Sequence, residues 1–209
     1  MKSALLAWYQ ANRRDLPWRK TQDPYAVLVS EIMLQQTRVE TVEQYFGKFL
    51  ERFPDIGTLA AADESDVLAA WSGLGYYRRA RLLHAGARHV ATTHGGEVPD
   101  DPDLLRQIPG VGRYTAGAIA SIAFERPTAL VDGNVARVLS RLQAIEDPKL
   151  QEAGAPGHWT MAQQIVQAGP PRVLAQALME LGATVCTPLG PRCEGCPVRS
   201  ECQALAKGL

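Results

Sequence analysis

The sequence predicts an all-α fold, and three observations support that prediction. No segment of the 209 residues shows a sustained alternation of apolar and polar residues, which is the pattern of a half-buried strand. Successive segments have the pattern of helices instead. Prolines stand at the starts of these segments or in the turns between them, where helices tolerate them. With 46% apolar and 21% charged residues, the chain has the composition of a folded globular protein.

We expect eleven helices, most of them bounded by residues that start or stop helices. Pro24 precedes the second, Pro102 begins the sixth, and Asp132 directly precedes the eighth as its default N-cap. Residues 146–157 are expected to form a loop. In chain order the helices are expected at about 2–13, 25–35, 38–51, 64–71, 76–93, 102–107, 113–123, 133–143, 158–168, 171–184 and 197–206.

The charge of the chain is balanced in number but unevenly distributed. Lys and Arg total 22, and Asp and Glu also total 22. Residues 76–89 contain four Arg and no acidic residue, whereas residues 97–103 contain four acidic residues and no basic one. Net neutrality counts against a nucleic-acid partner, while one basic and one acidic face would suit a DNA-binding protein. Solvated helix faces explain the same runs equally well.

No segment has the pattern of a membrane span or a secretory signal. The longest apolar runs, such as residues 26–29 and 32–34, are far too short to cross a bilayer. The N-terminal stretch lacks the long apolar region and the small-residue cleavage site of a signal peptide. We therefore expect a cytoplasmic protein with no membrane partner.

Four cysteines lie within 17 residues, and the chain has no others: Cys186, Cys193, Cys196 and Cys202. Two disulfides are not expected in a cytosolic chain. Four thiolates on a loop rich in Pro and Gly suit a metal centre. Zinc sites usually come as two short Cys pairs, and only one pair here is short. The uneven spacing favours an iron–sulfur cluster, with zinc as the alternative.

A glycine-rich turn, Pro109-Gly110-Val111-Gly112, separates two predicted helical segments. The glycines allow a sharp turn, and the second helix would start with free N–H groups that attract an anion. This helix-hairpin-helix pattern would bind one DNA phosphate without reading sequence. A turn that only connects two helices has the same pattern.

Two carboxylates are candidates for chemistry. Glu31 lies in an apolar helical segment, where desolvation would raise the pKa of its carboxyl, as a general acid requires. A Glu at the rim of a buried helix is the simpler reading. Asp132, as an N-cap, would accept backbone N–H bonds and stay ionised. One protonated and one ionised carboxyl is the division used on glycosidic bonds.

Six stretches of this chain together resemble the adenine DNA glycosylases of the MutY type, in the helix-hairpin-helix DNA glycosylase superfamily. Among them, LQQT and GLGYY are specific to this branch, while the hairpin and the cysteine loop are shared more widely. The stretches are RRDLPWR (13–19), SEIMLQQT (30–37), GLGYYRRAR (73–81), IPGVGRYTAGAI (108–119), VDGNVARVLSRL (131–142) and the cysteine loop 186–202.

The resemblance implies a two-lobed all-α fold in which a cleft receives double-stranded DNA. A six-helix lobe with the hairpin would span residues 20–125, and residues 1–19 with 126–209 would form the iron–sulfur lobe. An adenine mispaired with 8-oxoguanine or guanine would be flipped into the cleft. A monomer of bacterial type that acts at the nucleoid is expected.

The resemblance also implies roles for individual residues. Glu31 would protonate adenine N7, and Asp132 would stabilise the oxocarbenium-like sugar, directly or through a transient covalent adduct. Asn134 would place the attacking water, and Tyr114 would support Glu31. The adenine pocket would be lined by Arg14, Trp18, Arg19 and Gln176. DNA would be contacted by Gln36 and Tyr76 beside the lesion, by Arg78, and by the amides of Gly110, Val111 and Gly112 with a bound alkali cation. Cys186, Cys193, Cys196 and Cys202 would hold a [4Fe–4S] cluster.

The residue at position 114 also bears on strand cleavage. Endonuclease III-like relatives carry Lys at this place in the hairpin, and that amine forms a Schiff base and cuts the strand. Here the residue is Tyr114, and neither Arg113 nor Thr115 can form the imine. A monofunctional glycosylase without strong lyase activity is expected.

Members of this family usually continue into a C-terminal domain that helps to recognise 8-oxoguanine. The matched stretches end with the cysteine loop, so that domain is expected to be absent from these residues. The pairing partner would then be sensed by Gln36, Tyr76 and the turn 74–76.

Three rival functions are open at this stage. A thymine or uracil mismatch glycosylase shares the fold and an Asp like Asp132, but pyrimidine release needs no acid like Glu31. A non-catalytic DNA-structure binder would use only the hairpin and the basic residues 78–81. A zinc-stabilised scaffold would use the cysteines without an iron–sulfur cluster.

Overall fold

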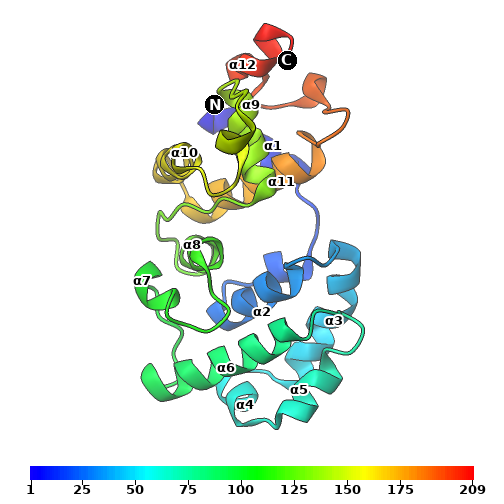
Figure 1. Ribbon diagram of the computed structural model, residues 1–209, viewed down its shortest axis with the longest axis vertical. Helices are drawn as coiled ribbons and strands as arrows, with labels where there is room; N and C mark the ends of the chain where they lie inside the picture. The colour runs from blue at the N-terminus through cyan, green and yellow to red at the C-terminus, as the bar shows by residue number, and fades with distance from the viewer. The chain divides into compact units, whose positions relative to one another are not determined.

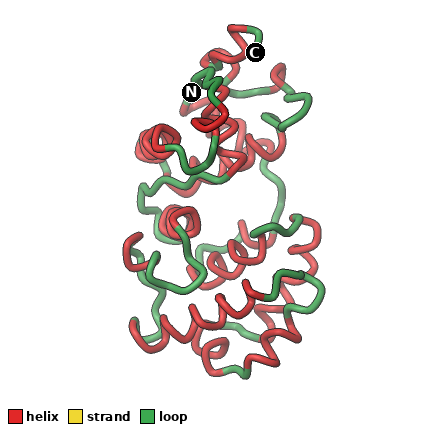
Figure 2. The backbone as a smooth tube through the Cα atoms, viewed as in Figure 1, coloured by secondary structure: helices red, strands yellow, loops and turns green.

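The computed structural model describes all 209 residues and consists of helices, turns and loops. Twelve α-helices and four short 3-10 helices follow one another, and no strand is present (Figure 2). The all-α class predicted from the sequence is thereby confirmed. No helix is both long and apolar enough to span a bilayer.

The chain forms two compact units (Figure 1). Residues 15–124 form one, here called the central unit, and residues 1–14 with 125–209 form the other, the terminal unit. The sequence placed the first boundary after residue 19. The boundary lies earlier because the ring of Trp18 packs edge-on against that of Phe46, with their centroids 5.7 Å apart, which ties residues 17–19 to the central unit.

Helix α2 (Pro24–Leu34) is the core element of the central unit. Asp23 caps it by accepting a hydrogen bond from the backbone N–H of Tyr25 at 3.1 Å, and every side chain from Tyr25 to Met33 is buried. This explains why the segment has apolar residues on nearly all faces. It packs against α3 (Val39–Arg52), α6 (Arg78–Thr93) and α8 (Arg113–Ile122).

Three short helices complete the central unit: α4 (Ile56–Ala61), α5 (Glu64–Ala70) and α7 (Pro102–Leu105). Helix α4 was not predicted, because six residues with an internal glycine give too little periodicity to detect. Asp55 stabilises it by accepting from the backbone N–H of Thr58 at 2.7 Å, and it packs on α6. The central unit therefore has seven α-helices where the sequence predicted six.

The terminal unit is built around two packed helices, α9 and α11. Helix α1 packs on α11, so the N-terminal helix folds with the C-terminal part of the chain. Helix α10 contacts both α9 and α11, and α12 contacts α9. The bounds are α1 (Lys2–Asn12), α9 (Gly133–Leu142), α10 (Pro156–Gln167), α11 (Pro171–Thr184) and α12 (Gln203–Lys207).

Three expected elements differ from the structure. The helix expected from residue 76 begins at Arg78, because Tyr76 has a left-handed backbone with φ of 47°. The helix expected at 197–206 is broken at Cys202, whose extended backbone separates the 3-10 turn Arg199–Glu201 from α12. The loop expected at 146–157 contains the 3-10 helix Pro148–Gln151.

His84 makes the stability of the central unit sensitive to acid. Burial, and then the positive charge of Arg88, lower the pKa of His84, against smaller opposite effects of a hydrogen bond to the backbone of Ala62 and of the negative charge of Glu64. A lowered pKa means that the unfolded chain binds the proton more readily, so stability is lost as the pH falls below about 6.5, the ordinary histidine value. We expect thermal unfolding at pH 5.5 to occur at a lower temperature than at pH 7.5. His84→Leu should reduce that difference, and a difference that this substitution leaves unaltered would contradict the prediction.

Candidate functional site

The candidate acid, Glu31, is buried in the central unit. It lies on α2 with a side chain only 6% exposed, between the fully buried neighbours Ser30 and Ile32. The residue is therefore buried within its unit, as the predicted acid role requires. Tyr114 is half-buried on the first turn of α8, the helix that packs on α2.

The predicted hairpin is formed by α7, residues 106–112 and α8. Gly110 has φ of 86°, and a Cβ there would lie 3.1 Å from Leu82 Cβ, so both conformation and space require glycine. Gly112 is the N-cap of α8 and offers no side chain to the N–H groups of the first turn. Because Gly112 and Arg113 are exposed, this helix end can receive an anion from solvent.

Gln36 and Tyr76 lie at the ends of two neighbouring loops of the central unit. Gln36 follows α2 with φ of 57°, and Tyr76 precedes α6 with φ of 47°. Both side chains are exposed, and that of Tyr76 is 60% exposed. Left-handed backbone is uncommon for residues other than glycine and concentrates at functional sites.

Asp132 is the N-cap of α9 in the terminal unit, as predicted. Its Oδ1 accepts from the backbone N–H of Val135 at 2.7 Å, and its Oδ2 accepts from Asn134 Nδ2 at 3.0 Å. Arg137 Nη2 donates to Asn134 Oδ1 at 2.8 Å, and Arg137 Nε donates to the carbonyl of Cys186 at 2.7 Å. These bonds fix the carboxylate and join it, through two side chains, to the start of the cysteine loop.

Close packing of α9 on α11 also depends on Gly182. Arg137 donates to its carbonyl at 2.8 Å, and a Cβ on Gly182 would lie 2.7 Å from Asn134 Cβ and 2.8 Å from the Asn134 carbonyl oxygen. The neighbour is backbone and cannot give way without moving α9. The glycine therefore sets the position of Asn134.

We expect Gly182→Ala to destabilise the protein by about 1–3 kcal/mol, the usual cost of overpacking. It should also slow any reaction that needs Asn134. Chemical denaturation measures the first effect. Gly157→Ala is the matched control, because nothing lies within 4 Å of a Cβ at that helical position. Equal stability of the two variants would contradict the packing argument.

Two of the residues predicted to line the adenine pocket have partners within the terminal unit. Arg14 pairs with Glu180, whose side chain is fully buried, at 2.8 Å between Arg14 Nη2 and Glu180 Oε2. The backbone N–H of Arg14 donates to the same carboxylate at 3.0 Å. Gln176 is buried, and its Oε1 accepts from the hydroxyl of Tyr9 at 2.5 Å. The other two, Trp18 and Arg19, belong to the central unit.

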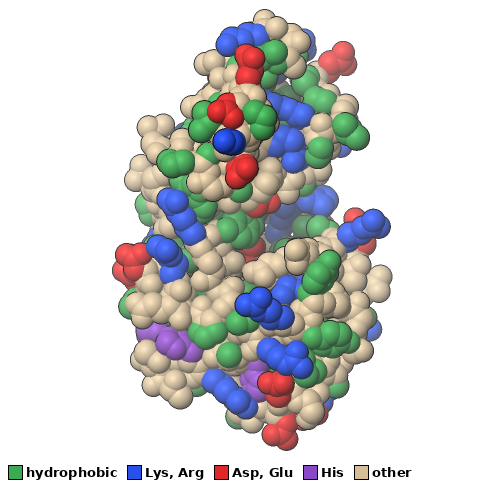
Figure 3. Space-filling model, viewed as in Figure 1, with side chains coloured by type: hydrophobic (Ala, Val, Ile, Leu, Met, Phe, Trp, Pro, Cys, Tyr) green, Lys and Arg blue, Asp and Glu red, His purple; other side chains and the backbone are tan.

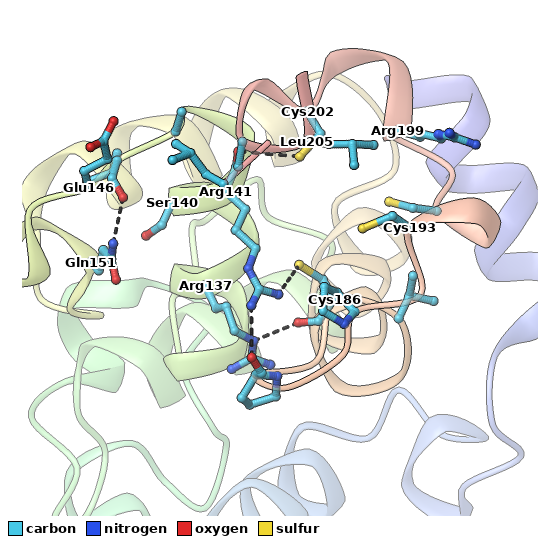
Figure 4. Close-up of a pocket in the computed structure, with 18 of the residues that line it drawn as sticks. Arg137, Ser140, Arg141, Glu146, Gln151, Cys186, Cys193, Arg199, Cys202 and Leu205 are labelled. Atoms are coloured by element: carbon cyan, nitrogen blue, oxygen red, sulfur yellow. Dashed lines mark hydrogen bonds between the residues drawn. The ribbon is translucent and has the colours of Figure 1, made fainter. Parts of the chain in front are cut away.

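The four cysteines line one cavity of about 690 Å³ in the terminal unit (Figure 4). None forms a disulfide. Arg141 projects from α9 into this region and donates to Cys186 Sγ at 3.3 Å and to the carbonyl of Thr187 at 2.7 Å (Figure 4). Burial raises the pKa of the Cys196 thiol, and the other three thiols act in the same direction.

Four thiols around one cavity are a donor set that an iron–sulfur cluster can use. No three His, Cys, Asp or Glu side chains lie close enough together to bind one metal ion. The four thiols line one cavity instead, and Arg141 donates a hydrogen bond to the sulfur of Cys186. The chemistry and spacing of the residues therefore fit an iron–sulfur cluster.

Basic residues are dispersed on the face of the molecule that Figure 3 shows. On the face drawn in Figure 3, Lys and Arg side chains lie among acidic and uncharged ones and form no continuous patch. Of the basic run 76–89, Arg78, Arg81 and Arg88 are exposed, but Arg79 is buried. The reading of that run as a uniformly solvated face is thus wrong at one residue.

Sequence reasoning missed three residues that position the site: Arg79, Arg137 and Glu180. Helical spacing contained a signal for the first two. Arg79 lies four residues before the buried Leu83, on the apolar face of α6. Arg137 lies three residues after Asn134 and four before Arg141, on one face of α9. Glu180 has no such signal, because its partner Arg14 is 166 residues away in sequence.

A family described as HhH-GPD superfamily base excision DNA repair protein matches residues 29–155. This assigns the chain to the helix-hairpin-helix class of base excision repair proteins. Two solved structures of DNA repair enzymes have the same fold as this chain. A thermostable thymine-DNA glycosylase has a TM-score of 0.90 and 31% identity over 98% of this chain and 94% of its own. A non-covalent endonuclease III–DNA complex, at 22% identity, covers 99% of this chain and 94% of its own, with a TM-score of 0.77 that supports the fold alone.

Relatives that are similar in sequence show to which family within this class the chain belongs. The chain is 50% identical to the adenine DNA glycosylase of Rattus norvegicus over 96% of this chain and 40% of that protein. It is 43% identical to the adenine DNA glycosylase of Mycolicibacterium smegmatis over 98% of this chain and 69% of that protein. The chain therefore belongs to the adenine DNA glycosylase family. It spans about two fifths of the length of its mammalian relatives.

Proposed function

We propose that this chain is the catalytic part of an adenine DNA glycosylase, which hydrolyses the N-glycosidic bond of adenine mispaired with 8-oxoguanine or guanine in duplex DNA. The observation that carries the proposal is the 43–50% identity to adenine DNA glycosylases from mammals, a plant, a yeast and a mycobacterium over at least 96% of this chain, which covers both units. Flipping the base costs a few kcal/mol, and least at a mispair.

Glu31 is the proposed general acid. A buried carboxyl favours its neutral form, which can give a proton to N7 of the flipped adenine. Protonation makes the base a better leaving group, because the electron pair of the breaking bond enters a cationic ring. The burial of Glu31 in α2 supports this role.

Asp132 is the proposed stabiliser of the cationic sugar that remains, directly or through a transient covalent adduct. Its two hydrogen bonds hold the carboxylate in one orientation. Asn134, held by Arg137, would place the water that attacks C1′. Tyr114 in place of a lysine leaves no amine for a Schiff base at this position, so the proposed enzyme does not cut the strand itself.

The hairpin at Gly110–Gly112 is the proposed phosphate-binding element, and it would also hold an alkali cation. The exposed, uncapped start of α8 supports it. Non-specific contact of this kind would hold duplex DNA of any sequence.

The cysteine cavity is the proposed site of a [4Fe–4S] cluster bound by Cys186, Cys193, Cys196 and Cys202. When bound, a cluster would supply a covalent cross-link that fixes the conformation of the loop 186–202. Arg141 would then donate a hydrogen bond to a ligating sulfur, as it does to Cys186 Sγ.

Cys196→Ser should remove the cluster and weaken DNA binding more than it lowers overall stability. The broad visible absorption of the cluster should disappear, and the dissociation constant for duplex DNA should rise at least tenfold. Ser200→Ala, in the same loop, is the control. A variant that has lost the absorption but binds DNA as tightly as the wild type would contradict the prediction.

A thymine mismatch glycosylase is the second candidate, favoured by the TM-score of 0.90 to the thermostable thymine-DNA glycosylase. Its identity of 31% lies below that of the adenine enzymes. A buried acid such as Glu31 suits purine release and is not needed for a pyrimidine.

Single-turnover base release from four duplexes tests the proposal: A opposite 8-oxoguanine, A opposite G, T opposite G, and A opposite T. Each is analysed with and without alkali treatment. We expect strand breaks only after alkali, and only at mispaired adenine. Thymine loss alone would move the chain to the second candidate, and strand breaks without alkali would contradict the absence of lyase activity.

A further inference from the structure

Gln36 and Tyr76 are exposed residues on two loops with strained backbone. Other contacts must therefore hold these loops in place. Gln36 is left-handed, and the turn 73–76 contains three left-handed residues, with φ of 102° at Gly73, 70° at Gly75 and 47° at Tyr76. Glycine adopts this conformation readily, but at Gln36 and Tyr76 it is uncommon and persists only where the surrounding structure enforces it. The side chain of Arg79 hydrogen-bonds to residues of both loops.

Arg79 is buried, only 6% exposed, and its guanidinium bonds to both loops at once. Nη1 donates to the carbonyls of Ile32 at 3.1 Å, Met33 at 2.7 Å and Gln35. Nη2 donates to Thr37 Oγ1 at 2.8 Å, the Leu74 carbonyl at 3.2 Å and the Gly75 carbonyl at 3.3 Å. One side chain therefore binds the residues on either side of Gln36 and the two residues before Tyr76.

The charge of Arg79 is compensated without a carboxylate among these acceptors. Its Nη1 partners are carbonyls at the C-terminal end of α2, where the helix dipole is negative. The rings of Trp71 and Tyr76 lie 5.5 Å and 5.3 Å from its Cζ, within range of a cation–π interaction. Arg79 thus supports the Tyr76 ring from behind while that ring remains exposed to solvent.

We propose that Arg79 is the positioning residue of the surface that distinguishes a mispair from a matched base pair. It holds the Gln36 amide and the Tyr76 ring as one rigid element, the amide suited to a base edge and the ring to stacking on a base. This inference rests on the proposed function. Arg79 itself is too buried to touch DNA, so it acts through the other two residues, whose fixed geometry reduces the entropy lost on binding.

Only a guanidinium can make these contacts. Its planar fork reaches acceptors on two loops in fixed directions, whereas a lysine ammonium is a single point charge. Arg79→Lys therefore keeps the charge but loses the connection between the loops. Thr37→Val is a milder change of similar shape that removes one acceptor, on the Gln36 side, and leaves Arg79 intact.

The experiment compares the dissociation constants of each variant for a duplex with A opposite 8-oxoguanine and for the same duplex fully matched. A 2-aminopurine beside the mispair reports local opening of the base stack. Arg79→Lys should reduce the preference for the mispair at least tenfold and suppress the fluorescence increase, while affinity for the matched duplex changes less than threefold. Thr37→Val should act in the same direction with a smaller effect. Arg52→Gln, which removes an exposed arginine paired with Asp66, is the control.

Unchanged preference and fluorescence in both Arg79→Lys and Thr37→Val would overturn the inference. If Arg79→Lys does not fold, the result for Thr37→Val decides. The wild-type measurement distinguishes a failure of the proposed function from a failure of the role assigned to Arg79. A wild type without preference for the mispair and without base release refutes the proposed function, whereas a wild type with both and variants that retain them refutes only the role of Arg79.

Discussion

Replacing Glu31 with Gln should abolish adenine release and leave DNA binding intact. The amide keeps the size and shape of the carboxyl but cannot donate a proton to N7. General acids contribute about 10²–10⁴-fold to rates, so the rate of single-turnover release should fall by about that factor and no free adenine should be detected on the time scale of the wild-type reaction. The dissociation constant for a mispaired duplex should change less than threefold, because Glu31 is buried on α2 and the proposed phosphate contacts lie elsewhere.

Glu40→Gln is the matched control, since Glu40 is an exposed carboxyl on α3 of the same unit. It should release adenine at the wild-type rate. Normal turnover by Glu31→Gln would reject the acid role. Loss of both turnover and binding, with a lowered melting temperature, would assign Glu31 to the stability of the core instead.

Asp132→Asn should have the second largest effect. Asparagine is as good an N-cap as aspartate, so α9 should keep its start and the protein its stability. The substitution removes the negative charge that would stabilise the positively charged, oxocarbenium-like sugar. Loss of one such electrostatic contact lowers the rate about 10²–10³-fold. Single-turnover release from the A·8-oxoguanine duplex measures it.

The control for Asp132→Asn is Asp147→Asn in the same unit, where the carboxylate also caps a helical turn by accepting from Lys149 N at 2.9 Å. That change should leave the rate unaltered. A rate within threefold of wild type for Asp132→Asn, in a protein with unchanged melting, would remove Asp132 from the proposed chemistry.

Much of the fold could be predicted because most helices carry a strong local signal. Helix α11, expected at residues 171–184, has those bounds, and most of the others differ by one or two residues at their ends. Helix α4 was not predicted because its stability comes from packing on α6 and from the Asp55 cap, and neither produces a periodic pattern in the sequence. The break at Cys202 was not predicted because it depends on the path of the cysteine loop.

The candidate site was predicted residue by residue, but the contacts that hold it were not. Family motifs indicated Glu31, Asp132 and the cysteines. They gave no indication that Arg79 is buried, because a run of arginines normally lies on the surface. The pair Arg14–Glu180 and the close approach of Gly182 to Asn134 join segments far apart in sequence, and only the folded chain brings them together.

The most direct test of the central claim is the identity of the base that the chain releases. Duplexes containing A opposite 8-oxoguanine, A opposite G and T opposite G are mixed in one reaction with the wild-type protein, and the free bases are identified by mass spectrometry. We expect free adenine and no free thymine, with adenine absent when Glu31→Gln replaces the wild type. Free thymine, or adenine released equally by the variant, would contradict the assignment of this chain as an adenine DNA glycosylase that uses Glu31.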